Sequence, residues 1–476
     1  MKVLFINSNV ERNPFPVVPL GLCYVASNLE GHTIEFLDLV FKKNPEQSII
    51  AALRSFRPDV VCVGIRNIDN VDYFSPRFYL EEIRLKIIDT VKAHTCAKII
   101  IGGSAVNISP ERVFSFLDAD FGIYGEGEES LNELLQSLEH GSLYTAVQGL
   151  VYKKDGEVVC NGPARVRDLS KIKFPRAYRW VQIKKYARYS SKINIQTKRG
   201  CPLHCSYCVY NRIEGSRVRL RPPEAVADEI ADAISSTGIR DIEFTDSVFN
   251  VPLSHASAIC REIIKRNIKA NFSTMGINPK FVTPEFVRLL EDAGFNEISV
   301  TPESASQKVI DGFCKGFMKE DIIQAAALLE KSALNVIWYF MFGGPGETSE
   351  TAEETIDFIK THIPPHHLIL SVGAVRIYSN TALERIALEE GVISGKTDLL
   401  YPTFYQSQSV APEHIKTQIQ RLIQDLPNCI ALEDNNIGMF YRILSVIISG
   451  YLRATKSRTP IWKYLIQLNR IKAALK

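Results

Sequence analysis

The sequence predicts an α/β protein in which a doubly wound parallel sheet is followed by a partial (β/α)6 barrel and a helical C-terminal region. Three observations lead to this prediction. Short β-branched runs alternate with helical patterns over residues 2–140, the same alternation resumes at residue 193, and the periodicity is mostly helical from about residue 392. With 476 residues, of which 46% are hydrophobic, the chain can form two or three cores.

The first unit has the pattern of a Rossmann-like sheet. Helical patterns such as "PLGLCYVASNLE" and "EESLNELLQSL" follow apolar runs that are short enough to be buried parallel strands. The candidate strands cover residues 2–7, 34–39, 59–64, 97–103 and 120–125. Two short strands around the turn "KKDGEVV" and a linker then interrupt this rhythm.

The second unit repeats strand and helix six times without a long polar insertion. Such a series predicts a curled sheet whose active site lies at the carboxyl ends of its strands. Its candidate strands are 193–199, 241–246, 270–275, 297–303, 335–342 and 368–377. We therefore expect a first domain over 1–145, a linker over 146–190, a barrel over 191–390 and a helical region over 391–476.

Charge and composition exclude several classes of protein. The chain has 56 basic and 53 acidic residues, a balance too even to indicate nucleic acid or an anionic membrane as the main partner. The start "MKVLFINSN" has no signal-peptide pattern, and the apolar stretch "GMFYRILSVIISGYL" is too short to span a membrane. We therefore expect a cytoplasmic protein without a transmembrane segment, in which closely spaced thiols bind metal or carry out redox chemistry.

Three cysteines, Cys201, Cys205 and Cys208, lie within eight residues in the loop after the first strand of the second unit. Soft thiolate ligands favour an iron–sulfur cluster or zinc. Three thiolates on a four-iron cluster leave one iron open, which is typical of a reactive centre and not of a structural one. The alternative is a structural zinc site completed by His204 or by a distant residue.

The spacing "CPLHCSYC", with Tyr207 before the third cysteine and a six-unit β/α block around it, resembles the radical SAM superfamily. The resemblance implies a [4Fe–4S] cluster held by the three cysteines. It also implies that S-adenosyl-L-methionine (SAM) binds the open iron and that reductive cleavage of this molecule yields a 5′-deoxyadenosyl radical. An external electron donor such as a flavodoxin or a ferredoxin would supply the electron.

Polar residues and glycines at successive strand ends match positions that contact SAM in this superfamily. The resemblance implies that carboxylate and hydroxyl groups reach the methionine or the ribose, that glycine backbone approaches the adenine, and that Arg376 and Tyr378 face the same mouth. We assign SAM contacts to Asp246, Glu303, Ser304, Gly343, Gly344 and Arg376. Considered singly, a strand-end carboxylate is often only solvated, and "GGPG" is more often a plain turn.

The order of the two units resembles the cobalamin-binding class of this superfamily over roughly residues 1–390. The resemblance implies that loops of the first sheet line a corrinoid, and we assign to this face Gly102, Gly103, Gly125 and Asn67, with Arg66 as a further candidate. Val40 stands where related cobalamin domains have a cobalt-binding histidine. Two alternatives remain open: the glycines only form tight turns, or the first unit has lost the corrinoid.

From this resemblance we expect a cobalamin-dependent radical SAM enzyme that methylates an unactivated carbon of a small molecule. The apolar C-terminal helices slightly favour a hydrophobic substrate. A cyclisation, oxidation or rearrangement without methyl transfer is the first alternative, and a non-catalytic metal- or corrinoid-binding sensor is another. The sequence assigns no side chain to catalysis itself.

Overall fold

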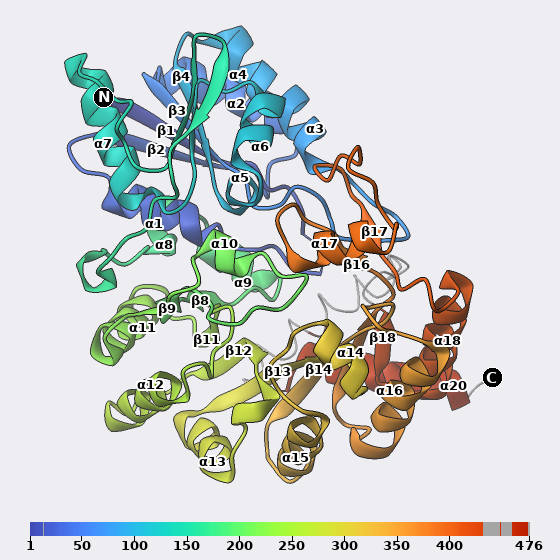
Figure 1. The fold of residues 1–476 in the computed structure, drawn as a ribbon. Helices are drawn as coiled ribbons and strands as arrows, with labels where there is room; N and C mark the ends of the chain where they lie inside the picture. Colours follow the sequence, from blue (N-terminus) through green and yellow to red (C-terminus); the bar gives the residue numbers. More distant parts are fainter. Residues whose placement is uncertain (13, 432–447, 449–458, 475–476) are drawn as a thin grey trace.

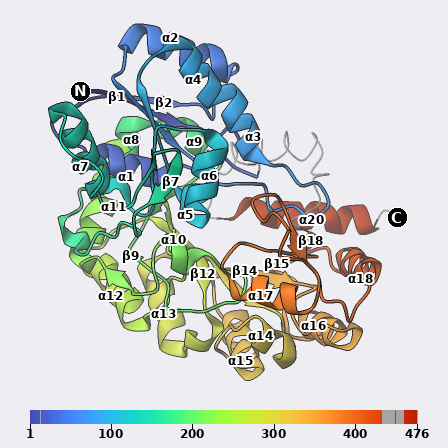
Figure 2. The same cartoon turned by 45° about the horizontal axis from the view of Figure 1, so that its top comes forward.

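The computed structural model describes residues 1–12, 14–431, 448 and 459–474. It contains two α/β units, each built on a seven-stranded sheet, and the small helix α10 (Tyr210–Ile213) lies between them in both views (Figures 1 and 2). The expected fold class is confirmed.

The first sheet has the strand order β2-β1-β3-β4-β5-β6-β7. Its strands are β1 (Lys2–Asn7), β2 (Thr33–Asp38), β3 (Val60–Gly64), β4 (Lys98–Gly102), β5 (Phe121–Ile123), β6 (Leu150–Lys154) and β7 (Glu157–Cys160). The first five strands are parallel, and β6 and β7 continue the sheet in antiparallel fashion. The sheet therefore extends past residue 145 into the segment that we expected to be a linker.

Alternating side chains of these strands belong to two separate cores, as a doubly wound sheet requires. Leu4 and Ile6 of β1 pack in one core, whereas Val3 and Phe5 pack in the other. The helices are α1 (Leu20–Asn28) and α7 (Gly127–His140) on the Val3 face, with α2 (Pro45–Phe56), α3 (Tyr79–Ile83), a π-helical turn (Arg84–Ile88), α4 (Asp89–His94), α5 (Ser104–Ile108) and α6 (Pro110–Leu117) on the other.

The segment between the two sheets packs against both units. It contains a 3₁₀ turn (Leu169–Lys171), α8 (Ala177–Trp180) and α9 (Ile183–Arg188). Trp180 Nε1 donates to Ser27 Oγ at 2.8 Å, and the Tyr186 hydroxyl donates to Asp38 at 2.9 Å. Tyr178 donates to Asp232 of the second unit at 2.7 Å, so the segment is a fixed connection.

The second sheet is entirely parallel, with the order β18-β15-β14-β13-β12-β11-β8. Its strands are β8 (Ile193–Ile195), β11 (Asp241–Phe244), β12 (Asn271–Ile277), β13 (Phe295–Glu303), β14 (Asn335–Met341), β15 (Leu368–Val372) and β18 (Cys429–Ala431). Six of them are the expected strands of the partial barrel. The seventh, β18, lies in the region that we expected to be helical.

Helices cover the outer face of this sheet, and two pairs of short antiparallel strands lie at its carboxyl edge. The helices are α11 (Pro223–Thr237), α12 (Leu253–Lys265), α13 (Pro284–Ala293), α14 (Gln307–Gly312), α15 (Lys319–Glu330), α16 (Ser349–His362) and α18 (Pro412–Asp425), with a 3₁₀ turn at Pro279–Phe281. The paired short strands are β9 (Lys198–Arg199) with β10 (Arg219–Leu220), and β16 (Val375–Arg376) with β17 (Phe404–Tyr405). Helix α17 (Ala382–Glu389) follows β16.

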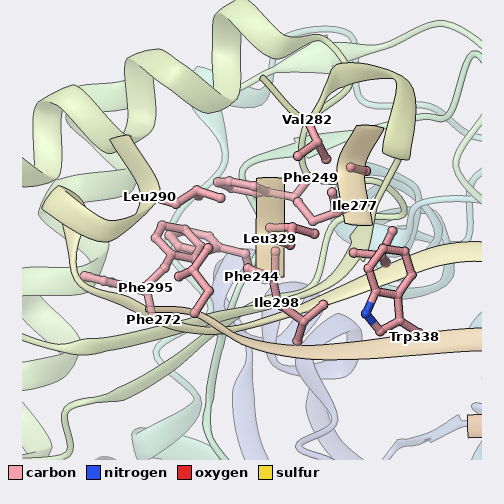
Figure 3. Close-up of a cluster of buried hydrophobic side chains, with 14 of the residues drawn as sticks. Phe244, Phe249, Phe272, Ile277, Val282, Leu290, Phe295, Ile298, Leu329 and Trp338 are labelled. Atoms are coloured by element: carbon pink, nitrogen blue, oxygen red, sulfur yellow. The ribbon is translucent and has the colours of Figure 1, made fainter. Parts of the chain in front are cut away.

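Aromatic and aliphatic side chains together fill the core between the second sheet and its helices (Figure 3). The Phe244 ring is stacked on Phe272 and on Phe295, with centroids 5.7 and 5.5 Å apart. These side chains are at most 6% exposed, and such ring pairs contribute about 0.5–1.5 kcal/mol each beyond their buried area. This core fixes the strand ends that carry the expected site.

The inner face of the second sheet is polar toward the amino ends of its strands. The strand register places Asn194, Glu243, Ser273 and Glu297 in one row across β8, β11, β12 and β13. Lys192 Nζ bonds Glu297 at 2.8 Å and Ser273 at 2.9 Å. Trp462 of α20 (Ile461–Ala474) also donates to Glu297, so this helix closes that end of the barrel.

Most of the apolar stretch 438–452 lies outside the described residues. In the part of the chain that the structure describes, no helix combines the length and the apolar character needed to cross a membrane.

Candidate functional site

The loop of residues 201–209 carries the three cysteines and is fixed to the second unit at several points. Cys201 is buried, and Cys205 and Cys208 are half-buried. The Cys201 N–H donates to Gly215 O at 3.0 Å, and the Ser206 N–H donates to Phe313 O at 2.9 Å. The loop therefore holds its thiols in place through its backbone.

The thiols of this loop interact electrostatically with one another. Burial raises the pKa of Cys208 to about 12, with further contributions from Cys205 and Cys201, and burial also raises the pKa of Cys205. Lys315 acts in the opposite direction on both groups. The donor set of three neighbouring thiols fits an iron–sulfur cluster, in which each thiolate binds a different iron atom.

Among the described residues, no group of three His, Cys, Asp or Glu side chains surrounds one point in the way a single bound ion requires. His204, the fourth ligand in the zinc alternative, is exposed.

Glu303 lies at the end of β13 and joins the cysteine loop to the segment after α14. Its carboxylate accepts hydrogen bonds from the Tyr207 hydroxyl at 2.6 Å and from Lys315 Nζ at 2.7 Å. Its backbone has a φ of +64°, which is uncommon for a residue other than glycine and is held by the surrounding contacts. The structure thus brings Glu303 to the cysteine loop, and its expected contact with SAM stays a prediction.

Asp246 contacts the segment that leads into the same loop, and its carboxylate oxygens already accept hydrogen bonds from groups of the protein. It accepts from the Thr197 N–H at 2.7 Å and the Thr197 hydroxyl at 2.6 Å, and from Lys198 Nζ at 3.2 Å. Thr197 and Lys198 immediately precede the cysteine loop. In this structure Asp246 therefore positions that loop and does not present a free carboxylate.

Ser304 and the glycine-rich loop after β14 are also engaged internally. Ser304 Oγ lies 3.0 Å from Thr355 Oγ1 and is buried. The N–H groups of Gly343 and Gly344 donate to Glu347 at 2.8 and 3.3 Å. A Cβ on Gly344 would lie 2.2 Å from the Phe313 ring, so packing alone requires glycine there.

Arg376 does not face an open mouth. Its guanidinium is buried against Asp69 of the first unit at 2.9 Å and donates to main-chain carbonyls, including Leu399 O at 3.1 Å. The Tyr378 ring lies 4.7 Å from the same guanidinium. Asp69 belongs to the loop that also carries Asn67, so Arg376 fixes this expected corrinoid loop to the second unit.

The expected corrinoid glycines fall into two kinds. An added Cβ on Gly102, at the end of β4, would make only ordinary contacts with Ile123, the nearest at 3.9 Å, so ligand could approach it. Gly103 and Gly125 have φ values of +106° and +108°, and an added Cβ would collide with Ile65 O and Ala164 O. Tight backbone packing explains these two glycines whether or not a ligand binds. Val40 is buried in a hydrophobic core.

The acidic residues of the expected corrinoid loop "YGEGE" instead contact the second unit. Arg199 pairs with Glu126 at 3.1 Å and with Glu128 at 2.6 Å, and Arg219 also pairs with Glu126 at 2.6 Å. All four side chains are at most 12% exposed. Arg199 lies two residues before Cys201, so these pairs link the first unit to the cysteine loop.

The two expected cofactor sites meet at α10. Val209, next to Cys208, packs in the core of the first unit together with Ala105 and Val106 of α5, which begins beyond Gly103. The Arg66 guanidinium interacts with the Tyr210 side chain, and Tyr210 is 44% exposed. The carboxyl end of the first sheet therefore adjoins the cysteine loop.

Sequence reasoning missed several residues of this region, among them Lys315, Asp69 and Glu347. Lys315 and Asp69 act through partners distant in the chain, such as Tyr207 for Lys315, 108 positions away. The segment "GFCKGF" holds no pattern that distinguishes its lysine from a surface one. The segment "GGPGE" did hold a signal for Glu347, since a carboxylate three or four residues after a glycine can accept a hydrogen bond from the N–H of that glycine.

Comparison with known proteins agrees with the geometry. Residues 9–135 match the B12 binding domain, and residues 195–359 match the radical SAM superfamily. An uncharacterized methyltransferase of Pyrococcus horikoshii is 27% identical over 372 residues, covering 76% of this chain and 78% of that protein. The tryptophan 2-C-methyltransferase of Streptomyces laurentii is 24% identical over 417 residues, covering 75% and 69%.

A solved structure shows the same fold over the whole chain. It is the radical S-adenosylmethionine methyltransferase TsrM from Kitasatospora setae, determined with cobalamin and a [4Fe-4S] cluster bound. The TM-score is 0.82 at 21% identity, and the match covers 99% of each chain. A B12-binding domain followed by a radical SAM domain is thus confirmed.

Proposed function

We propose that this chain, which joins a B12-binding domain to a radical SAM domain, is a cobalamin-dependent enzyme that methylates an unactivated carbon of a small molecule. Methyltransferases among its relatives and the TsrM fold support the proposal. The observation that carries it is the packing of Val209, next to Cys208, against α5 at the end of the first sheet. This contact brings a cluster site and a corrinoid site to one place.

The side chains present fit the three groups. Cys201, Cys205 and Cys208 would hold the cluster and leave one iron open for SAM. Glu303 is the strand-end carboxylate that reaches this loop, and Gly102 is a strand-end position that a corrinoid could approach. When bound, the cluster and SAM supply a 5′-deoxyadenosyl radical that abstracts hydrogen, and methylcobalamin supplies the methyl group.

The protein itself supplies position and exclusion of water. Asp246 holds the strand that leads into the cysteine loop, and the Tyr207–Glu303 hydrogen bond fixes the middle of that loop. Met275 projects from strand β12 and is 44% exposed, so the inner face of the barrel offers apolar surface next to the polar row. An apolar substrate group can cover Met275 and keep water from the reacting carbon.

We further infer that the protein works in the cytoplasm with an external one-electron donor such as a flavodoxin or a ferredoxin. Low-potential donors of this kind are found in reducing compartments, where free thiols persist.

Anaerobic reconstitution with iron, sulfide and hydroxocobalamin tests the proposal. We expect the absorbance of both a cluster and a corrinoid, cleavage of SAM upon reduction, and, with SAM bearing a deuterated methyl group, products of a metabolite pool that carry the label. Products without added methyl would support a cyclisation or rearrangement instead. Bound zinc without iron, or no SAM cleavage, would contradict the proposal and support a sensor.

A further inference from the structure

Lys315 lies beside the cysteine loop in a fully enclosed position. It follows α14, and its side chain is 6% exposed. Its ammonium bonds Glu303 Oε1 at 2.7 Å and the Tyr207 hydroxyl at 3.3 Å, and it lies 5.6 Å from the centroid of the Tyr207 ring. Tyr207 stands directly before Cys208, so a fixed cation adjoins two of the three thiols.

The backbone keeps Lys315 at this distance. Phe313, two residues earlier, accepts the N–H of Ser206 within the cysteine loop at 2.9 Å, and the Phe313 and Tyr207 rings contact each other edge to face with centroids 5.4 Å apart. These contacts therefore fix the lysine relative to the cysteine loop. The ammonium cannot turn to solvent without breaking its hydrogen bond to Glu303.

Two charges of opposite sign act on the thiols from this side. The Lys315 ammonium and the Glu303 carboxylate both bond the Tyr207 hydroxyl, at 3.3 and 2.6 Å, and both side chains are 6% exposed. Removing one of the two charges therefore changes the field at the neighbouring thiols in the opposite direction from removing the other. Buried charges interact strongly because little water screens them.

We propose that Lys315 is a positioning residue whose fixed charge makes a cluster on the three thiolates easier to reduce. The inference rests on the proposed function, since it assumes that these thiolates hold an iron–sulfur cluster. Three thiolates give the loop an excess of negative charge, and one-electron reduction adds another. A cation held nearby stabilises the reduced form, and the net charge around a cluster is one determinant of its reduction potential.

The decisive experiment is a redox titration of the reconstituted protein with dithionite as reductant, monitored by electron paramagnetic resonance in the absence of SAM. For Lys315→Met we expect an about tenfold lower ratio of reduced to oxidised cluster at a fixed potential, which corresponds to about 59 mV for a one-electron couple. For Glu303→Gln, which removes the opposing charge, we expect a shift to more positive potential. Lys315→Arg should stay close to the wild type.

Opposite shifts separate an electrostatic role from a structural one. If Lys315 only holds Glu303 in place, the reduction potentials of Lys315→Met and Glu303→Gln shift in the same direction or not at all, and the inference is wrong. Lys308→Met on α14, where the side chain is exposed, is the matched control and should not shift. If Lys315→Met fails to load iron, the Arg and Gln variants still give the test. If the wild type itself binds no cluster, the proposed function fails first.

Discussion

At the scale of single residues, the glycines of the first sheet show how one residue type serves two purposes. An added Cβ on Gly102 would make only ordinary contact with Ile123, whereas Gly103 has a positive φ and an added Cβ there would collide with Ile65 O. Gly102 ends β4 and Gly103 follows it, and the sequence presents them only as the pair "GG". Their different surroundings allow ligand approach and backbone packing to be tested separately.

We predict that Gly102→Ala leaves the fold intact and weakens corrinoid binding, because an added methyl group fills space that only a ligand would use. Gly103→Ala should instead destabilise the protein without cofactor by about 1–3 kcal/mol, since alanine is strained at a φ of +106°. Thermal unfolding of the apoprotein and corrinoid absorbance after reconstitution measure the two effects. Full corrinoid binding by the Gly102 variant would contradict the assigned site.

The Glu347 carboxyl group gives a prediction about pH. Burial raises its pKa to about 7 from the ordinary value of 4.5, despite hydrogen bonds from Gly343 and Gly344. The folded protein therefore keeps this proton between about pH 4.5 and 7, while the unfolded chain releases it. This group accordingly lowers the stability as pH rises through that range, and the difference between the two pKa values corresponds to about 3 kcal/mol.

Glu347→Gln removes this ionisation, so we expect the stability of the variant relative to the wild type to increase from pH 4.5 to pH 7. Thermal unfolding of both proteins over this range is the measurement. Glu353→Gln, an exposed position on α16, the helix that follows Glu347, serves as control. A constant difference between Glu347→Gln and the wild type across the range would show that Glu347 ionises normally.

At the scale of elements, long-range ion pairs join loops that the sequence treats as independent. Arg376 of β16 and Asp69 of the loop after β3 are 307 positions apart and at most 3% exposed. Arg112 of α6 and Asp398 form a second pair between the units, but both side chains are more than 40% exposed. Both are pairs of arginine and aspartate, but the first pair is buried and the second is exposed.

We expect Asp69→Ala to cost about 3–5 kcal/mol, because it leaves a buried guanidinium without a counter-ion. Asp398→Ala should cost less than about 1 kcal/mol, as is usual for an exposed pair. Adding Arg376→Met to Asp69→Ala should recover part of the loss. Hydrogen exchange at residues 66–72 and 375–377 reports the local stability, and equal effects of the Asp69 and Asp398 variants would contradict the argument.

The sequence located most regular elements, since apolar runs between turn residues are a local signal. Strand β1 has its predicted bounds, and β13 and β14 differ by two residues or fewer. The seventh barrel strand β18 has three residues and no period of its own, and only its pairing with β15 makes it a strand. Cysteine spacing likewise located the thiols, whereas the partners of Asp246 and Arg376 depend on contacts between distant segments.

At the scale of the whole molecule, buried charge fixes the orientation of the two units at two separate places. Arg376 pairs with Asp69 at one, and Arg199 pairs with Glu126 and Glu128 at the other. Burial alone raises the pKa of Glu126, yet its arginine partners hold it below the ordinary value. Glu126 therefore remains ionised at neutral pH, and salt screens these pairs little because they are buried.

This arrangement predicts that a change in the first unit affects the metal site of the second. Glu128→Ala removes the 2.6 Å partner of Arg199 and leaves it only Glu126 at 3.1 Å, a carboxylate that Arg219 also binds. Arg199 is two residues before Cys201, so the start of the cysteine loop should loosen. We expect less iron per chain after reconstitution, although Glu128 is far from every cysteine of the loop in sequence.

Iron content and limited proteolysis near residues 199–201 check this prediction. Glu129→Ala, the exposed neighbour on α7, should load iron like the wild type. Glu128→Gln keeps the shape of the side chain and removes only its charge, so it should fall between the two if the ion pair is the cause. If Glu128→Ala loads a full cluster, the two units are held by apolar packing around Val209 and α5, and the charges at the interface serve only to orient them.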